Sequence, residues 1–129
     1  MNDADVVADA SAVIALLIGE PFHGFDPQRL ANASMSAVNL SEVLARLLAI
    51  GMPESAVDIA VANLNLRVVP FDEPQARATA RLRSVTRHAG LSLGDRACLA
   101  LGLRLGSPVV TADRVWATVD VGVEIVLIR

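Results

Sequence analysis

Four acidic residues occupy similar places along the chain: three come just past an apolar, strand-like run, and the fourth begins a helix-like run that leads into one. Asp9 follows the first apolar run, and Glu42 lies in the first turn of the helix-like segment after the second one. Asp95 lies in the first turn of a later helix-like segment, and Asp113 follows the apolar run Val109–Thr111. In an open parallel α/β sheet the strand-to-helix junctions lie at the carboxyl edge, where ligands bind. We therefore expect these carboxylates to converge on one cleft, although they are far apart in the sequence.

Each carboxylate also has a local structural explanation. Residues 39–42 (Asn-Leu-Ser-Glu) fit a capping box, in which the glutamate side chain accepts a hydrogen bond from the asparagine amide. That glutamate could also pair with Arg46 one turn later. Residues 92–95 (Ser-Leu-Gly-Asp) fit the same box. Asp9 and Asp113 could be simple N-caps, because acids near helix N-termini are favoured by the helix dipole.

Taken together, the four carboxylates predict a cation site. Carboxylates that gather in one cleft repel one another by several kcal/mol at an effective dielectric constant of about 20, and helix dipoles offset only part of this repulsion. The remainder requires raised pKa values or a bound cation. Oxygen ligands without neighbouring cysteine or histidine pairs favour a hard ion, Mg²⁺ or Mn²⁺. Such an ion, with water among its ligands, is suited to phosphodiester hydrolysis.

The segments that must position these residues alternate between strand-like and helix-like patterns, with Gly and Pro at their boundaries. This alternation implies crossover connections and a mainly parallel sheet that is covered on both faces. We expect one domain over residues 1–129, with an α/β fold. The expected strands are 6–8, a short strand within 33–38, 67–71, 109–111 and 123–128. The expected helices are 10–18, 40–50, a helix with an apolar stripe at Val57, Ala60, Val61 and Leu64, and the segments 74–89 and 93–105.

Composition limits the class of protein. The chain has 129 residues, of which 53% are hydrophobic, and a net charge of −3. This hydrophobic content excludes a disordered chain, yet the longest run without a polar side chain, 12–19, is far shorter than the roughly 18 residues of a membrane span. The acidic start, 1–5, lacks the basic region of a secretory signal, and the single cysteine, Cys98, cannot form an internal disulfide. We therefore expect a cytoplasmic protein without a membrane segment.

The acids lie within longer segments that follow one another in a characteristic order. These segments are Val7–Ala12, Ala37–Val43, Leu91–Ala100, Thr111–Trp116 and Val121–Ile125 with the terminal strand. Together they resemble PIN-domain ribonucleases of the VapC type, the toxins of type II toxin–antitoxin pairs, over essentially the whole chain. The resemblance implies a PIN-like three-layer α/β/α sandwich with a short, mainly parallel sheet. It also implies an acidic pocket that binds one or two Mg²⁺ or Mn²⁺ ions and cleaves RNA.

The resemblance also assigns roles to single residues. The family's acidic quartet is matched by Asp9, Glu42, Asp95 and Asp113. The hydroxyl and amide positions beside the quartet, which orient carboxylates, are matched by Ser11, Thr111 and Asn39. The three aspartates would hold the metal, and the glutamate would bind it directly or orient a water molecule. The choice between one and two ions stays open.

Arginine supplies all 11 basic residues. Arg77, Arg81 and His88 form one stripe of their helix, and Arg83 and Arg87 form another. A solvated helix surface is the simpler interpretation of these stripes, and contact with RNA phosphate is the alternative. Arg96 and Arg114 each follow an acid of the quartet and would form either a local ion pair or a phosphate contact. The candidates for RNA contact are Arg77, Arg81, Arg87, Arg96 and Arg114.

Partners and alternatives follow from the same patterns. The apolar stripes of the 40–50 helix and of the next helix exceed what one small core needs, which favours an interface. We expect a homodimer and a groove for an amphipathic helix of a VapB-like antitoxin. The alternative function is a non-catalytic PIN-fold module that binds protein or RNA. Aspartyl phosphoryl transfer, as in receiver domains and haloacid-dehalogenase-like phosphatases, is excluded because the chain has no lysine.

Overall fold

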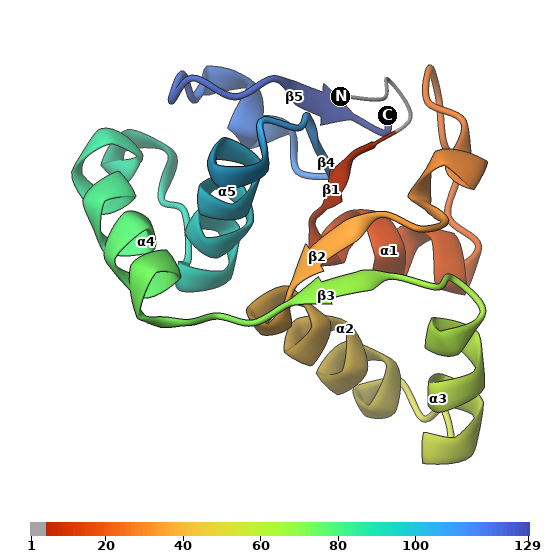
Figure 1. Ribbon diagram of the computed structural model, residues 1–129. Helices are drawn as coiled ribbons and strands as arrows, with labels where there is room; N and C mark the ends of the chain where they lie inside the picture. Colours follow the sequence, from red (N-terminus) through yellow and green to blue (C-terminus); the bar gives the residue numbers. More distant parts are fainter. Residues whose placement is uncertain (1–4) are drawn as a thin grey trace.

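The fold is built on a sheet of five parallel strands in the order β3-β2-β1-β4-β5 (Figure 1). The computed structural model describes residues 5–129, so the acidic start that lacks a secretory pattern lies, over residues 1–4, outside the described residues. The predicted α/β class and parallel sheet are confirmed. The strands are β1 (Val7–Ala8), β2 (Ser34–Ser36), β3 (Arg67–Val69), β4 (Val109–Thr111) and β5 (Ile125–Leu127).

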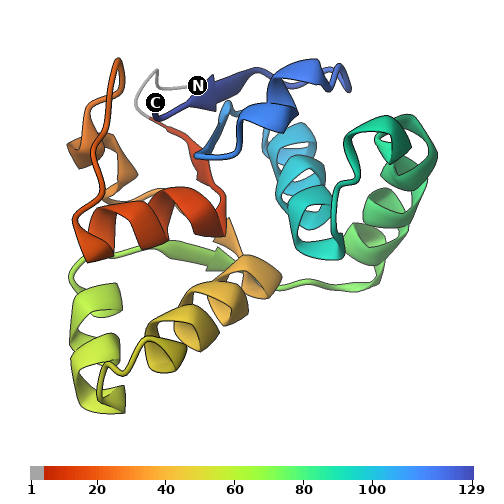
Figure 2. The same ribbon diagram turned by 180° about the vertical axis from the view of Figure 1, so that it is seen from behind.

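Helices cover the sheet on both faces. Figures 1 and 2 show α1, α2 and α3 on one side of the central strands and α4 and α5 on the other. Neighbouring residues of one strand accordingly enter different cores. Val7 and Val109 pack with α4 and α5, whereas Ala8 and Val110 pack with α1, α2 and α3. The bounds are α1 (Ala10–Ile18), α2 (Ala37–Ala49), α3 (Glu54–Ala62), α4 (Glu73–Val85) and α5 (Leu93–Leu105), with the 3₁₀ turns η1 (Pro27–Leu30), η2 (Arg87–Ala89) and η3 (Arg114–Thr118).

The start of α2 differs from its prediction. The Ser36 side chain accepts a hydrogen bond from the Val38 N–H at 3.2 Å and caps the helix, which therefore begins at Ala37. Asn39 consequently lies inside the helix, and the predicted capping box of residues 39–42 is wrong. This shift decides the role of Asn39, because an asparagine within the helix can turn its side chain toward a neighbouring element.

Two other segments end earlier than the patterns suggest. The helix predicted over 74–89 stops at Val85, where the Thr86 hydroxyl donates to the Leu82 carbonyl at 2.8 Å and the chain continues as η2. The strand predicted over 67–71 stops before Pro70, which has no N–H to donate to a ladder. The short turn η1 was not predicted. Within residues 5–129 no helix combines the length and apolar character needed to cross a membrane.

The topology brings distant segments to one edge of the sheet. Strands β1 and β4 are neighbours, with Val7 opposite Val109 and Ala8 opposite Val110. The residues that follow β1 therefore lie beside the end of β4. The first turns of α2 and α5 meet at the same edge, where Asn39 of α2 donates a hydrogen bond to the carbonyl of Gly94 in α5 at 3.0 Å.

Candidate functional site

Asp9 is the buried member of the candidate site. It follows β1 at the N-cap of α1, but its carboxylate makes no capping hydrogen bond, so its interpretation as a simple N-cap is wrong. Its Oδ2 instead accepts hydrogen bonds from Ser11 Oγ at 2.6 Å and from Thr111 Oγ1 at 2.9 Å. Ser11 Oγ accepts from the Ala112 N–H, and Thr111 Oγ1 accepts from the Asp113 N–H. Both hydroxyl protons can therefore point at the Asp9 carboxylate. The hydrogen bond from Thr111 to Asp9 connects the end of β4 to the end of β1.

The surroundings of Asp9 disfavour its negative charge. Burial raises the pKa of this carboxyl from its ordinary 3.8 to about 6, against the opposing effect of its two hydroxyl donors. The charges of Asp95 and Glu42 add to the rise. Burial, together with the charges of the same three acids, also raises the pKa of the Cys98 thiol, which lies fully buried in α5. Three of the four predicted carboxylates, Asp9, Glu42 and Asp95, are therefore close enough to influence the same titratable groups.

Glu42 is positioned by a contact between two helices. Asn39 is fully buried, and its Nδ2 donates to Glu42 Oε1 at 2.8 Å as well as to the Gly94 carbonyl. A Cβ placed on Gly94 would lie 2.5 Å from Glu42 Oε1, so the carboxylate rests against the first turn of α5 only because residue 94 is glycine. Within residues 5–129 no ion pair joins Glu42 to Arg46, and that alternative is wrong.

Asp95 and Asp113 are held by local hydrogen bonds. The predicted capping box is confirmed at α5, since the Ser92 N–H donates to Asp95 Oδ2 at 3.0 Å and the Asp95 N–H donates to Ser92 Oγ. Asp113 caps η3 by accepting from the Val115 N–H at 3.1 Å. Both aspartates use one carboxylate oxygen for these caps. The backbone N–H of Asp113, bound to Thr111, connects it to the hydroxyl pair around Asp9.

The four carboxylates share a region without forming a tight cluster. Across the described chain, no three or more His, Cys, Asp or Glu side chains converge closely enough to hold a metal ion. The expected close gathering of the quartet is therefore absent from these side-chain positions, because each member is held by its own hydrogen bonds. The donor set nevertheless fits a hard cation: it consists of carboxylates, and among the described residues burial and two acids disfavour the charge on Asp9, with no positive charge acting in its favour.

Comparison with family models matches residues 6–122 to the PIN domain. The chain belongs to the PIN-domain family. The family is thus established over most of the chain, in agreement with the order of its acidic segments.

Solved structures share the fold of this PIN domain at low sequence identity. VapC20 from Mycobacterium tuberculosis, described as a Sarcin-Ricin loop cleaving toxin, is 21% identical with a TM-score of 0.70, over 92% of this chain and 98% of that chain. DNA-bound VapBC from Salmonella typhimurium is 20% identical with a TM-score of 0.70, over 94% and 96%. FitAcB from Neisseria gonorrhoeae is 19% identical with a TM-score of 0.65, over 94% and 96%. No curated protein matched.

The arginines that were candidates for RNA contact separate into different environments. Arg77 is neutralised by Glu73, with 2.7 Å between Nη2 and Oε2. Arg114 Nε donates to the carbonyl of Arg129, and Arg96 Nη1 donates to the carbonyl of Thr79 at 3.0 Å. Within residues 5–129 neither Arg96 nor Arg114 forms an ion pair with the adjacent acid, so that one of the two alternatives is wrong. Arg81 is exposed, while Arg87 borders a hollow that it shares with Arg83 and Arg96.

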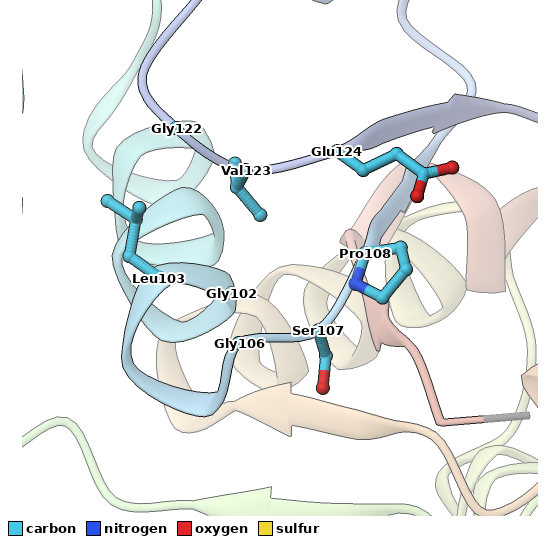
Figure 3. Close-up of a pocket in the computed structure, with 8 residues that line it drawn as sticks. All are labelled: Gly102, Leu103, Gly106, Ser107, Pro108, Gly122, Val123 and Glu124. Carbon is cyan, nitrogen blue, oxygen red and sulfur yellow. The ribbon is translucent and has the colours of Figure 1, made fainter. Parts of the chain in front are cut away.

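A second hollow lies away from the acids. It has a volume of about 180 Å³ and is lined by the segments that precede β4 and β5, at the amino edge of the sheet (Figure 3). Figure 3 shows Val123 pointing toward α5 and the carboxylate of Glu124 turned away from Leu103. Because the four carboxylates lie at the opposite edge, this hollow takes no part in the candidate site of the PIN domain.

Two residues whose neighbours lie in other elements escaped prediction from the sequence. Gly94 was treated only as part of a capping box, although a glycine in the first turn of a helix signals close approach of another group. Arg83 was noted on its helix stripe but not selected for RNA contact. Both omissions have the same cause. Gly94 of α5 lies against Glu42 of α2, and Arg83 of α4 shares its hollow with Arg96 of α5.

Proposed function

We propose that this PIN domain is a metal-dependent endoribonuclease of the VapC type, which hydrolyses RNA phosphodiester bonds at Asp9, Glu42, Asp95 and Asp113. The observation that carries the proposal is the buried carboxylate of Asp9, whose pKa of about 6 is raised by burial and by two neighbouring acids. Negative charge gathered in this way favours the binding of a cation and disfavours the binding of further anions. Family membership and the fold shared with VapC20 support the same interpretation.

Some of these residues would hold a metal ion, and others would orient a water molecule or the carboxylates. Asp9, Asp95 and Asp113 would hold Mg²⁺ or Mn²⁺, and Glu42 would bind it or orient a water molecule. When bound, such an ion lowers the pKa of a coordinated water and neutralises charge at the phosphate. The protein contributes fixed orientation, since two hydroxyls direct Asp9 and the buried Asn39 amide directs Glu42.

The test is cleavage of a mixed RNA pool with Mg²⁺, with Mn²⁺ and with EDTA. We expect cleavage only with a divalent ion, and a loss of at least about 100-fold in Asp9→Asn and Glu42→Gln. Asp58→Asn and Glu54→Gln are matched controls, because they remove the same groups from exposed positions of α3. Cleavage in EDTA, or full activity of Asp9→Asn, would overturn the proposed chemistry.

A non-catalytic binding module is the alternative. It is favoured by one observation, that no three acids of the described chain converge tightly enough to hold a metal. A binding module would show no divalent-dependent cleavage and no change in thermal midpoint with Mn²⁺. The nuclease should be stabilised by Mn²⁺ in the wild-type protein and not in Asp9→Asn, because a ligand stabilises only the state that binds it.

We also propose an antitoxin partner and a homodimer. Exposed apolar side chains on α2 and α3 offer a surface for another chain, and the largest exposed fraction among them is the 64% of Ile59. Several structures that share this fold are toxin–antitoxin complexes by name, including VapBC from Salmonella typhimurium. If a small reading frame adjoins the gene, co-expression with it should yield a complex on size-exclusion chromatography, and sedimentation of the chain alone should give the mass of two copies. A monomer that captures no neighbour-encoded protein would refute both.

A further inference from the structure

Three arginines from different elements surround one hollow. Arg83 lies near the end of α4, Arg87 in η2 and Arg96 in the first turn of α5, and Gly90 and Leu91 complete the lining. The hollow has a volume of about 510 Å³. No acidic residue lines it, so its walls combine positive charge with one aliphatic side chain.

No acid among residues 5–129 forms an ion pair with these arginines. Within residues 5–129 the arginines in ion pairs are Arg67, Arg77 and Arg129, and the three around the hollow are not among them. Arg96 is anchored to α4 through its Nη1, which donates to the Thr79 carbonyl, while its buried Nε has no hydrogen-bond partner in the described chain. Like charges around one hollow repel one another, and a buried donor without a partner is costly, so both features favour a bound anion.

The position of Arg96 relates the hollow to the acidic site. Asp95 precedes it in α5 and is held by the capping hydrogen bonds with Ser92. Successive residues of a helix point about 100° apart, so the aspartate faces the acids while Arg96 faces α4. The acids and the guanidinium groups therefore lie on adjacent faces of the first turn of α5. An RNA strand with one phosphate at the acids can bring a nearby phosphate to the arginines.

We propose that Arg83, Arg87 and Arg96 form a binding site for backbone phosphate of the RNA strand, beside the bond that is cleaved. The inference rests on the proposed nuclease function and identifies how its substrate is held. Arginine suits this role because its planar fork of donors matches phosphate oxygens in two-point contacts. Such contacts position the strand and carry no base sequence information. Arg77 and Arg81 lie on the same helix and do not line the hollow.

The test compares two double variants. Each removes two positive charges, and all four altered residues lie in α4 or in η2, which follows it. Arg83→Gln/Arg87→Gln removes two arginines from the hollow, and Arg77→Gln/Arg81→Gln removes two from the exposed surface of α4. Binding of a fluorescein-labelled single-stranded RNA of mixed sequence is measured by anisotropy in EDTA, over a series of salt concentrations. All the altered side chains are exposed, and equal thermal midpoints will show that both proteins are folded.

We expect the variant of the hollow to bind RNA at least about tenfold more weakly, because it loses two guanidinium groups that can bind phosphate. The slope of log K against log salt should fall by about 1.4, which is roughly 0.7 for each phosphate of a single strand that is no longer neutralised. The control pair should leave the slope unchanged. Equal weakening in both variants, unchanged binding in the first, or no RNA binding by the wild type would overturn the proposal. Because this assay needs no cleavage, its outcome is separate from that of the nuclease test.

Discussion

Replacement of Asp9 by asparagine should stabilise the folded protein at neutral pH in the absence of divalent ions. The carboxyl has a pKa of about 6 in the folded chain, against an ordinary value of 3.8. Folding therefore places a negative charge in surroundings that disfavour it, since only 4% of the residue is exposed. Asparagine keeps the size of the side chain and an oxygen that can accept from Ser11 and Thr111, but it carries no charge.

The magnitude follows from linkage between protonation and folding. One pKa unit corresponds to about 1.36 kcal/mol, so a rise from 3.8 to about 6 costs the folded state about 3 kcal/mol at pH 7.5. The new amide N–H₂ needs an acceptor, and an unmet donor costs about 1 kcal/mol. Asp9→Asn should therefore raise the free energy of unfolding by about 2 kcal/mol at this pH.

The stability difference between Asp9→Asn and the wild-type protein should depend on pH. Between pH 3.8 and 6 the folded wild-type chain binds more protons at Asp9 than the unfolded chain, so this residue makes stability fall as the pH rises through that window. The advantage of Asp9→Asn should therefore be full above pH 7 and about 0.6 kcal/mol near pH 5, and below about pH 4 the unmet amide donor should make the variant less stable than wild type.

The assay is urea unfolding in EDTA, followed by circular dichroism at several pH values. Asp58→Asn, which removes an exposed carboxylate from α3, is the control and should change stability by less than about 0.5 kcal/mol. If Asp9→Asn is no more stable than wild type at pH 7.5, or if its advantage persists unchanged at pH 3.5, the argument from burial is refuted.

Three further substitutions test the contacts around the acids. Gly94→Ala should displace the Glu42 carboxylate, because a Cβ would lie 2.5 Å from its Oε1. Cleavage of the RNA pool should then fall about tenfold or more, while the free energy of unfolding in urea changes by less than about 1 kcal/mol. Unchanged cleavage would contradict the assigned contact. Thr111→Val removes a hydroxyl that lowers the pKa of Asp9, so NMR titration of that carboxyl should give a pKa above the wild-type value, and a lower one would count against this interpretation. Asn39→Leu removes the buried amide that joins Glu42 to Gly94 and should cost about 1–3 kcal/mol in urea unfolding; a neutral change would mean that the amide does not couple the two helices.

Much of the fold could be predicted because its signals are local. Apolar strands separated by helical patterns predict a parallel sheet, and the helix over Ala10–Ile18 was predicted with its observed bounds. The errors arose where two local signals compete. Ser36 and Asn39 are both good capping residues, and the serine caps α2 because the helix begins directly after β2. Thr86 similarly ends α4 through a hydrogen bond that the helical pattern does not reveal.

The site was predicted as a set of residue types and not as a geometry. The order of the acidic segments was sufficient to select Asp9, Glu42 and Asp95, whose charges the structure brings to act on one region. Their separation was not predictable, since each is held by partners from another part of the chain or by its own capping bonds. Arg83 illustrates the same limit, because the hollow that it lines is completed by Arg96, which lies across the interface between α4 and α5.

The candidate residues and the order of the elements could be predicted from the sequence, because residue type and short-range periodicity are properties of the chain alone. The sequence placed carboxylates at the strand-to-helix junctions of a parallel sheet. Packing of the elements was needed to bury Asp9 and raise its pKa, to place Glu42 against Gly94, and to pair some arginines with acids while others border a hollow. Burial, close approach and charge pairing depend on distances between segments remote in sequence, and these distances exist only once the helices have packed on the sheet.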